Sequence, residues 1–347
     1  MTKFVRLSLF LLLLLAACGQ RETAVDHMQR AAVAQENGDA QTAVAEFDQA
    51  IALDPTLPDA YLGRGTAYAT LGNYAQAMVD YNQAIALSAN NPVAYNALGY
   101  VRQLVGDDAQ AIADYSQAIT LNPNYTEAYF NRGLLYRKLG NYEAALTDLG
   151  NVLRLTPDDA QTYLERSAIF TELGQPAAAL SDLNQTLTLA PRNVQAYNSR
   201  GMLYRLTGEN QKAFDDFSQA IALAPDYAPA YLNRGILFVQ AGDLENGLID
   251  YNQAIAIDAN NAEAYVNRGT AYLRQNELDK ALADLDQAIA LDDKLSIAYV
   301  NRGNAYASMG ETEKAIDDLQ RYLELEPDSA LAEQVLAKIA ELEAANP

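Results

Sequence analysis

Cysteine, histidine and tryptophan are almost missing from this sequence of 347 residues, which contains one cysteine, one histidine and no tryptophan. A single cysteine excludes a disulfide bond within the chain. One cysteine and one histidine also exclude a metal site built from several such ligands, so we expect no metal and no cofactor. Catalysis by a histidine base would depend on His27 alone, and the sequence has no glycine-rich phosphate loop ending in Lys-Ser or Lys-Thr. We therefore predict that the chain is not an enzyme.

Positive charge is also scarce, because 24 Lys and Arg residues stand against 45 Asp and Glu residues and give a formal net charge of −21. A chain this acidic repels phosphate backbones, so nucleic acid is a poor partner. The carboxylates could in principle supply acid–base pairs, but they recur at a fixed interval and do not gather at one place. This recurrence indicates a structural role for them.

Only one long hydrophobic run is present, from Leu7 to Ala17, and it follows a positively charged start. Eleven residues are too few to span a membrane, which takes about 20, and the layout is that of a secretory signal. The ending Leu-Ala-Ala-Cys resembles a bacterial lipobox, in which the cysteine, here Cys18, is lipid-modified. The resemblance implies a lipoprotein signal peptide at 1–17, and a lipidated cysteine with a short tether at 18–23. It also implies a lipid-anchored protein of the cell membrane or outer membrane, on the periplasmic or extracellular face.

The main feature that is present is a period of 34 residues. Tyrosine recurs at this interval eight times, and aspartate recurs eight times at another position of the same period. The tyrosines are Tyr61, Tyr95, Tyr129, Tyr163, Tyr197, Tyr231, Tyr265 and Tyr299, and the aspartates are Asp80, Asp114, Asp148, Asp182, Asp216, Asp250, Asp284 and Asp318. Such regularity indicates one supersecondary unit copied many times, which offers a long surface for holding other molecules.

Each repeat is predicted to contain two helices. In the stretch 126–159, apolar residues stand at helical spacing on both sides of Gly140. We expect Gly140 to end the first helix in the left-handed conformation, Asn141 to cap the second helix, and Pro157 to follow its end. Asn276 takes the place of this glycine in the eighth repeat, and asparagine also tolerates the left-handed conformation.

The repeats resemble tetratricopeptide (TPR) repeats of the subtype rich in Asn-Arg-Gly. This tripeptide stands at 131–133, 233–235, 267–269 and 301–303, and the fourth repeat combines Tyr129, Gly133, Tyr136, Ala145 and Pro157 in the family's order. The resemblance implies an all-α fold, a right-handed α-solenoid of nine helix-turn-helix repeats with a C-terminal capping helix.

The predicted repeats follow one another without insertion. They occupy 24–57, 58–91, 92–125, 126–159, 160–193, 194–227, 228–261, 262–295 and 296–329. Residues 330–347 are predicted to form the capping helix and tail, with Leu331, Val335, Leu336, Ile339 and Leu342 as the apolar positions. His27 stands where the other repeats carry tyrosine, so we interpret it as a variant of that structural residue.

One ladder of charged residues pairs arginine on the first helix of a repeat with aspartate on the second. We predict ion pairs between the helices for Arg132 with Asp148, Arg234 with Asp250, and Arg268 with Asp284. The third repeat has Leu98 in place of the arginine but carries Arg102 one turn later, which suggests compensation. A structural role is favoured for this ladder over a binding role. Loss of one partner should cost about 3–5 kcal/mol if the pair is buried and about 0–1 kcal/mol if it is exposed.

A second ladder lies on the face of the first helices that, by resemblance to the family, lines a concave groove. We call this surface the predicted groove. Its asparagines could hydrogen-bond an extended peptide backbone, or could merely keep a helix face soluble. Its members are Asn131, Asn233, Asn267 and Asn301, the apolar Phe130, Leu134, Met202, Leu232, Ile236, Val266 and Val300, and the cationic Arg137, Arg205 and Arg274.

These features together predict a lipid-anchored scaffold or adaptor of the cell envelope that mediates protein–protein interaction. Its partner would be another protein or an extended segment of one, held in the predicted groove. The alternative is a surface receptor that captures small extended peptides. One stoichiometric protein partner would favour the scaffold, and many chemically different ligands with weak affinity would favour capture.

Overall fold

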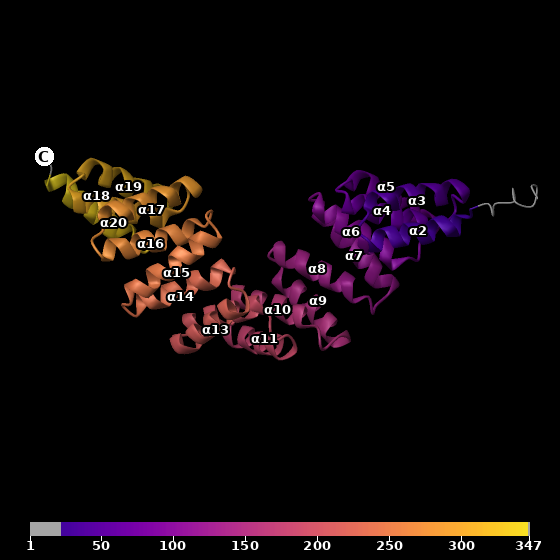
Figure 1. Ribbon diagram of the computed structural model, residues 1–347, viewed down its shortest axis with the longest axis horizontal. Helices are drawn as coiled ribbons and strands as arrows, with labels where there is room; N and C mark the ends of the chain where they lie inside the picture. Colours follow the sequence, from indigo (N-terminus) through magenta and orange to yellow (C-terminus); the bar gives the residue numbers. More distant parts are fainter. Residues whose placement is uncertain (1–21, 346–347) are drawn as a thin grey trace, which may run out of the picture. The chain divides into compact units, whose positions relative to one another are not determined.

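The computed structural model describes residues 22–345, and the described part of the chain consists of nineteen α-helices without any strand (Figure 1). The predicted all-α fold is confirmed. The helices are α2 (Ala24–Glu36), α3 (Ala40–Leu53), α4 (Pro58–Thr70), α5 (Tyr74–Leu87), α6 (Pro92–Leu104), α7 (Asp108–Leu121), α8 (Thr126–Lys138), α9 (Tyr142–Leu155), α10 (Ala160–Glu172), α11 (Pro176–Leu189), α12 (Val194–Leu206), α13 (Asn210–Leu223), α14 (Ala228–Gln240), α15 (Leu244–Ile257), α16 (Ala262–Arg274), α17 (Leu278–Leu291), α18 (Ser296–Met309), α19 (Thr312–Leu325) and α20 (Ala332–Ala345).

Each of the nine 34-residue ranges holds one pair of helices, and the two helices of a pair are joined by a short turn. The turn after α8 shows why. Gly140 has φ of 74°, a left-handed conformation that favours glycine, and its N–H donates to the carbonyl of Arg137 at 2.9 Å. Asn141 then caps α9, because its side-chain oxygen accepts from the N–H of Ala144 at 3.3 Å. In the eighth repeat, Asn276 adopts the same conformation with φ of 60°.

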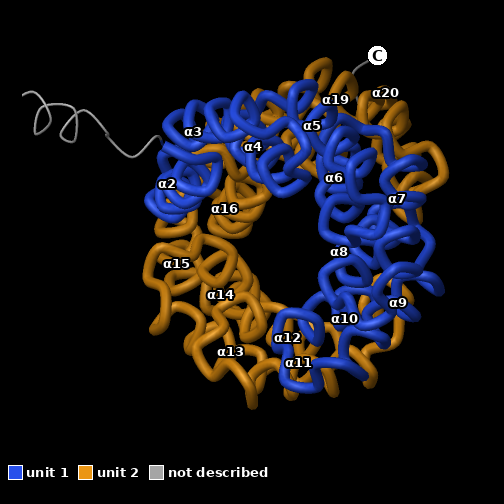
Figure 2. The backbone as a smooth tube through the Cα atoms, turned by 90° about the vertical axis from the view of Figure 1, so that its right-hand side faces the viewer, with its two compact units in different colours: residues 1–169 blue, residues 170–347 orange. Residues whose placement is uncertain are grey.

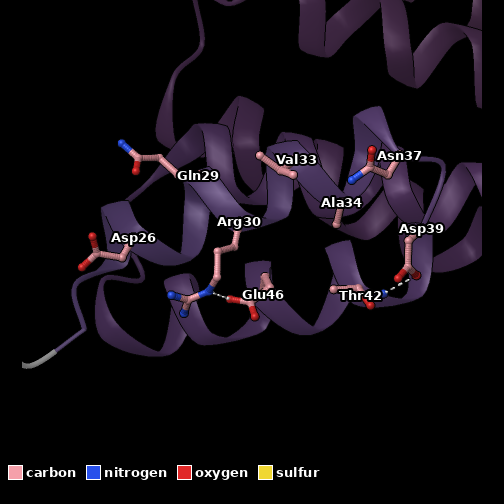
Figure 3. Close-up of a pocket in the computed structure, with 9 residues that line it drawn as sticks. All are labelled: Asp26, Gln29, Arg30, Val33, Ala34, Asn37, Asp39, Thr42 and Glu46. Carbon is pink, nitrogen blue, oxygen red and sulfur yellow. Dashed lines mark hydrogen bonds and ion pairs between the residues drawn. The ribbon is translucent and has the colours of Figure 1, made fainter.

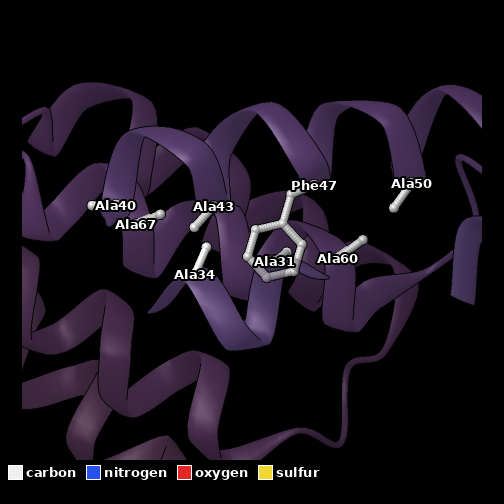
Figure 4. Close-up of a cluster of buried hydrophobic side chains, with 8 residues drawn as sticks. All are labelled: Ala31, Ala34, Ala40, Ala43, Phe47, Ala50, Ala60 and Ala67. Carbon is white, nitrogen blue, oxygen red and sulfur yellow. The ribbon is translucent and has the colours of Figure 1, made fainter. Parts of the chain in front are cut away.

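The helices of one pair approach closely because small residues face each other. In the first repeat, Ala31 and Ala43 are fully buried beside the ring of Phe47 (Figure 4). In the fourth repeat, a Cβ added at Gly133 would lie 3.2 Å from the side chain of Leu149. The repeating glycine and alanine positions therefore set the spacing of the pair, and large side chains on the second helix fill the remaining room.

The chain divides into two compact units, residues 1–169 and 170–347, which Figure 2 shows in different colours. Both contain the same pattern of successive helix pairs, with cores such as the one around Tyr115 in the first unit and the one around Tyr251 in the second. Among the described residues, no helix combines the length and the apolar character that crossing a membrane requires. The predicted signal peptide and Cys18 lie outside the described residues.

The last helix, α20, covers the end of the repeat array. Val335, Ile339 and Leu342 are buried in one cluster with Leu319 and Tyr322 of α19. The sequence also assigned Leu331 and Leu336 to the apolar set, but both side chains are exposed. The buried residues repeat every three or four positions, so they form one stripe, and Leu336 lies outside it.

Candidate functional site

The predicted ion pairs between the two helices of a repeat are present. In the fourth repeat, Nε of Arg132 donates to Oδ2 of Asp148 and Nη2 donates to Oδ1, both at 2.8 Å. The same two-point contact joins Arg234 to Asp250 and Arg268 to Asp284. The aspartates are buried, and hydrogen bonding to Asp148 raises the pKa of Arg132. Every predicted pair is therefore a charge-assisted bidentate contact in the interior of its repeat.

Each of these arginines also reaches the preceding repeat. Nη1 of Arg132 donates to the hydroxyl of Ser116 at 2.7 Å, and Nη1 of Arg268 donates to the side chain of Asn252 at 2.7 Å. The guanidinium of Arg132 lies 5.9 Å and 5.8 Å from the ring centres of Tyr129 and Tyr136. One side chain thus links three helices from two repeats, and each of its three nitrogens donates a hydrogen bond. These contacts favour a structural role for this ladder.

The third repeat uses the substitute that its sequence suggests. Nη1 of Arg102 donates to Oδ2 of Asp114 at 2.7 Å, a single contact instead of two. Burial raises the pKa of Asp114 to about 6, because one arginine contact only partly offsets the loss of water. The carboxyl group of Asp114 therefore keeps its proton to a higher pH than a free aspartate does.

In the first repeat, His27 takes part in an ion-pair cluster. Its Nδ1 lies 2.7 Å from Oε2 of Glu46, and Nε of Arg30 donates to the same oxygen at 2.9 Å. Its side chain is buried between the two helices. The residue thus has both the position of the structural tyrosine and a polar contact of its own.

The asparagine ladder links neighbouring repeats. Nδ2 of Asn131 donates to Oδ1 of Asn96 at 3.1 Å, and Nδ2 of Asn233 donates to Oδ1 of Asn198 at 3.0 Å. Nδ2 of Asn301 donates to the hydroxyl of Thr270 at 2.9 Å. These bonds run between successive first helices, and they use one of the two amide N–H groups. The carbonyl oxygens of Asn131 and Asn233 accept no hydrogen bond from the described residues.

Asn267 differs from the rest of this ladder. Its Nδ2 donates to the carbonyl of Glu263 on its own helix at 2.9 Å, so it makes no bond to another repeat. The sequence predicted either binding or solubility for these asparagines. The structure adds a third role for the others, which is to tie one first helix to the next.

The apolar members of the predicted groove do not form one exposed stripe. Met202 is exposed, and Phe130, Leu134 and Ile236 are half-buried. Leu232, Val266 and Val300 are buried, so their assignment to an accessible groove was wrong.

The reason for this burial is the position of the three residues on the helix side that meets the next repeat. Leu232 belongs to a buried cluster with Ala264 and Ala271 of α16, the first helix of the following repeat. Val266 packs in the same way with Ala298 of α18, and Val300 packs with residues of α19 and α20. Packing against the helices that follow thus covers this position in the seventh, eighth and ninth repeats, whereas the equivalent Phe130 of the fourth repeat stays half-buried.

The predicted cationic points have different surroundings. Nη1 of Arg137 donates to Oε2 of Glu165 at 2.9 Å, so its charge is compensated by the next repeat. Nη1 of Arg274 donates to the carbonyl of Val239 at 3.3 Å. Nε of Arg205 is buried without a hydrogen-bond acceptor among the described residues. Arg137 and Arg274 are therefore both engaged in contacts within the protein.

A cavity of about 640 Å³ opens within the first unit, beside two members of the predicted groove, Phe130 and Asn131. Asn96 of α6 and Tyr125, before α8, form part of its wall, and Val152 of α9 is at its apolar side. Nδ2 of Asn96 donates to the hydroxyl oxygen of Tyr125 at 3.4 Å, and burial raises the pKa of Tyr125. The cavity thus offers an aromatic and apolar surface next to hydrogen-bonding groups.

Carboxylates complete this cavity, and sequence reasoning missed them. They are Glu127 in the first turn of α8, and Asp158 and Asp159 in the loop before α10. The sequence contained a signal, since Asp158 and Asp159 are adjacent acids in a loop that follows Pro157. All three carboxylates belong to the fourth repeat, 126–159, and the period does not reveal that its first turn and its last loop line one cavity.

Two further cavities in the first unit contain an arginine that is paired with a carboxylate. One is lined by residues of α2 and α3 and of the turn between them, where Arg30 donates to Glu46 and the side chain of Asp39 accepts from Thr42 (Figure 3). The other, of about 280 Å³, is lined by Arg64 and Asp80. Within residues 22–345, no group of three or more His, Cys, Asp or Glu side chains is arranged to hold a metal ion.

Comparison with protein families finds tetratricopeptide repeat profiles along most of the chain. Profiles described as TPR repeat match residues 36–72, 65–106, 104–140 and 235–276, and profiles described as tetratricopeptide repeat match 126–159, 170–228 and 269–340. The search of curated proteins gives no significant match.

Several solved structures have a similar fold. The Cut9 and Hcn1 hetero-tetramer of the APC/C gives a TM-score of 0.58 at 18% identity, over 77% of this chain and 52% of that chain. This chain therefore spans about half the length of that relative. A tetratricopeptide repeat protein from Parabacteroides merdae gives 0.55 at 21% identity, over 72% of this chain and 98% of that one.

A third similar structure is yeast Tom70, with a TM-score of 0.52 at 15% identity, over 94% of this chain and 90% of that one. At these identities the similarity concerns the fold alone. The family profiles support membership in the family itself, because they match the sequence of the repeats in both compact units. The chain therefore belongs to the tetratricopeptide repeat proteins.

Proposed function

We propose that this protein is a lipid-anchored scaffold or adaptor of the cell envelope, which holds a protein partner or an extended segment of one. The tetratricopeptide repeats support the binding of another protein, since such arrays present extended surfaces for protein–protein interaction. Lipid anchoring and the envelope location come from the sequence around Cys18. No catalytic role is included in the proposal.

The observation that carries the binding role is the cavity beside Phe130 and Asn131. Its volume of about 640 Å³ lies in the range typical of sites that hold small molecules or side chains. The half-buried ring of Phe130 offers apolar contact, while the free carbonyl oxygen of Asn131 can accept from a peptide N–H. A binding surface needs both kinds of group, one to gain affinity from desolvation and one to fix orientation.

The anchoring role depends on Leu15, Ala16, Ala17 and Cys18, which have the order of a bacterial lipobox after an apolar run. Helix α2 begins at Ala24, so only five residues would separate the lipid from the repeats. Five extended residues reach about 18 Å, which would keep the first repeat near the bilayer surface. The test is to express the full chain and its Cys18→Ser variant with an alkyne fatty acid, then measure label and membrane fractionation. Label on the variant, or none on the wild type, would reject the anchor.

The experiment that tests the binding role is photocrosslinking in cells from an exposed position on the predicted groove. Met202 is suitable because its side chain is exposed, whereas Leu232 and Val266 are buried. A photoreactive residue at Gln287, an exposed position on the second helix α17, serves as the matched control. One dominant protein adduct from Met202 alone would support the scaffold.

Other outcomes have different meanings. Many weak peptide adducts from Met202 would favour the alternative, a surface receptor that captures small extended peptides. Adducts from Gln287 without any from Met202 would place the interface on the second helices and would contradict the predicted groove.

A further inference from the structure

The cavity beside Phe130 and Asn131 differs in charge from the cavities beside Arg30 and Arg64. It is lined by three carboxylates, those of Glu127, Asp158 and Asp159, and none of its lining residues is a lysine or an arginine. The cavities beside Arg30 and Arg64 each contain a cation already paired with a carboxylate. This cavity thus carries negative charge that the lining does not compensate.

The three carboxylates have different availability. Asp159 accepts from the N–H of Gln161 at 3.2 Å and from the hydroxyl of Thr162, so it serves the start of α10. Glu127 and Asp158 are exposed, and neither forms a hydrogen bond or an ion pair with the described residues. Two acids therefore remain available for a ligand at the cavity's rim.

The rest of the lining supplies acceptors and a flat aromatic surface. Asn131 donates to Asn96, and Asn96 donates to the oxygen of Tyr125, so this chain of bonds leaves the carbonyl oxygen of Asn131 as an open acceptor. The rings of Phe130 and Tyr125 and the side chain of Val152 provide the apolar part. A group that fits needs an aliphatic or flat stem with several N–H donors at its end.

We propose that this cavity receives a basic side chain, lysine or arginine, carried by an extended segment of the protein partner. The stem lies against Phe130 and the cationic head meets Glu127 and Asp158, with a hydrogen bond to the carbonyl oxygen of Asn131. Both basic side chains have an apolar stem and a charged head, and arginine also stacks well on aromatic faces. This inference rests on the proposed function and adds the chemistry of the partner's segment.

The test uses the full chain in cells, with a photoreactive residue at Gln161, an exposed position that lines the cavity. The wild-type sequence is compared with a Glu127→Gln/Asp158→Asn double variant. Loss of the two exposed contacts to the cation should lower the adduct yield about tenfold in the double variant. The crosslinked segment of the partner, read by mass spectrometry, should contain a lysine or an arginine.

A matched double variant, Glu143→Gln/Asp317→Asn, removes the same charge from exposed positions outside the cavity and should leave the yield unchanged. Thermal unfolding of both double variants should match the wild type, because Glu127 and Asp158 have no partner to lose. A photoreactive residue at Met202 reports partner binding separately.

The outcomes distinguish the inference from the proposed function. An unchanged adduct yield at Gln161 in the Glu127→Gln/Asp158→Asn variant, or a crosslinked segment without a basic residue, would overturn the inference. The proposed function would still be supported in that case if the Met202 adduct forms. Equal losses in the two double variants would show a general charge effect and would also overturn it. Absence of adducts from both Gln161 and Met202 would reject the proposed function itself.

Discussion

The guanidinium of Arg132 holds both carboxylate oxygens of Asp148, with Nε–Oδ2 and Nη2–Oδ1 distances of 2.8 Å. Its third nitrogen, Nη1, reaches Ser116 of the preceding repeat at 2.7 Å. One side chain therefore fixes the helix pair of its own repeat and also the stacking on its neighbour. Stability in such arrays is approximately the sum of the stability of each repeat and of each interface between repeats. Loss of one Arg–Asp pair should therefore destabilise both its own repeat and the interface with the preceding repeat.

The Asp250→Ala variant tests the energy of this contact. Asp250 has a side chain only 4% exposed, and its loss leaves the 20% exposed Arg234 without its two-point partner. Breaking a buried pair on one side typically costs about 3–5 kcal/mol, and the partial exposure of Arg234 places our expectation at about 3 kcal/mol. Thermal unfolding followed by circular dichroism should show a clear drop in the melting temperature.

The matched control for Asp250 is Glu245→Ala, which removes an exposed carboxylate from the first turn of the same helix, α15. We expect a change within about 0.5 kcal/mol for this variant. Equal melting temperatures for Asp250→Ala and the wild type would show that water already screens the pair and that it adds nothing to stability.

Asp114 should make the third repeat sensitive to pH. Its folded-state pKa is raised to about 6 from the ordinary 3.8, so the folded chain binds its proton more tightly than the unfolded chain does. The stability gained from this proton is fully present below about pH 4 and is lost as pH rises through about 6. After allowance for solvent near the 23% exposed Arg102, we expect a loss of about 1–2 kcal/mol.

Measurement of melting temperatures between pH 4 and 8 for the wild type and Asp114→Asn checks this expectation. The variant cannot ionise at that position, so the wild type should lose stability relative to it as pH rises. Asp317→Asn, an exposed change on α19, should run parallel to the wild type. A constant difference between wild type and Asp114→Asn across this range would contradict the raised pKa.

The asparagines offer a comparison between two members of one ladder. Asn233 donates to Asn198, whose side chain is buried, whereas Asn267 donates only to its own helix. Asn233→Ala leaves the Asn198 oxygen without its donor and should cost about 1–3 kcal/mol. Asn267→Ala should change stability by about 0.5 kcal/mol or less. Equal changes in the free energy of unfolding for the two variants would show that the hydrogen bond between repeats does not stabilise the protein.

Much of the fold could be predicted because its signals are local and repeated. Gly140 and Asn276 mark turns because they tolerate the left-handed conformation, and Asn141 marks the start of α9 through its side-chain cap; the structure places all three there. The ion pair of Arg132 with Asp148 could also be predicted, because two periodic series of opposite charge imply contact in every repeat. Signals of this kind do not depend on how one repeat stacks on the next.

The errors concern positions whose surroundings come from another repeat. Leu232 and Phe130 occupy equivalent places 102 residues apart, yet Leu232 is buried and Phe130 is half-buried beside a cavity. Asn198 is buried at the same place even though it is polar. Exposure here depends on the side chains of the following repeat, so the residue type alone does not determine it.

Substitution of Leu232 distinguishes a core residue from a binding residue. Leu232→Ala should lower stability by about 2–5 kcal/mol, because it leaves a hole in the cluster formed with Ala264 and Ala271. Met202→Ala, at an exposed position of the predicted groove, should change stability by about 0.5 kcal/mol or less. Denaturant midpoints measure both effects. An unchanged midpoint for Leu232→Ala would contradict the burial of Leu232 and would favour its exposure on the predicted groove.

Substitution by alanine should have opposite effects on stability at two glycines, Gly201 and Gly150. A Cβ at Gly201 of α12 would lie 2.6 Å from the ring of Phe217, so Gly201→Ala forces the helix pair apart and should cost about 1–3 kcal/mol. A Cβ at Gly150 of α9 meets nothing within 4 Å, and alanine is the better helix former. Gly150→Ala should therefore stabilise the protein by about 0.5–1 kcal/mol. A lower melting temperature for Gly150→Ala would contradict the open space around Gly150. A higher melting temperature for Gly201→Ala would contradict the close packing of Gly201 against Phe217.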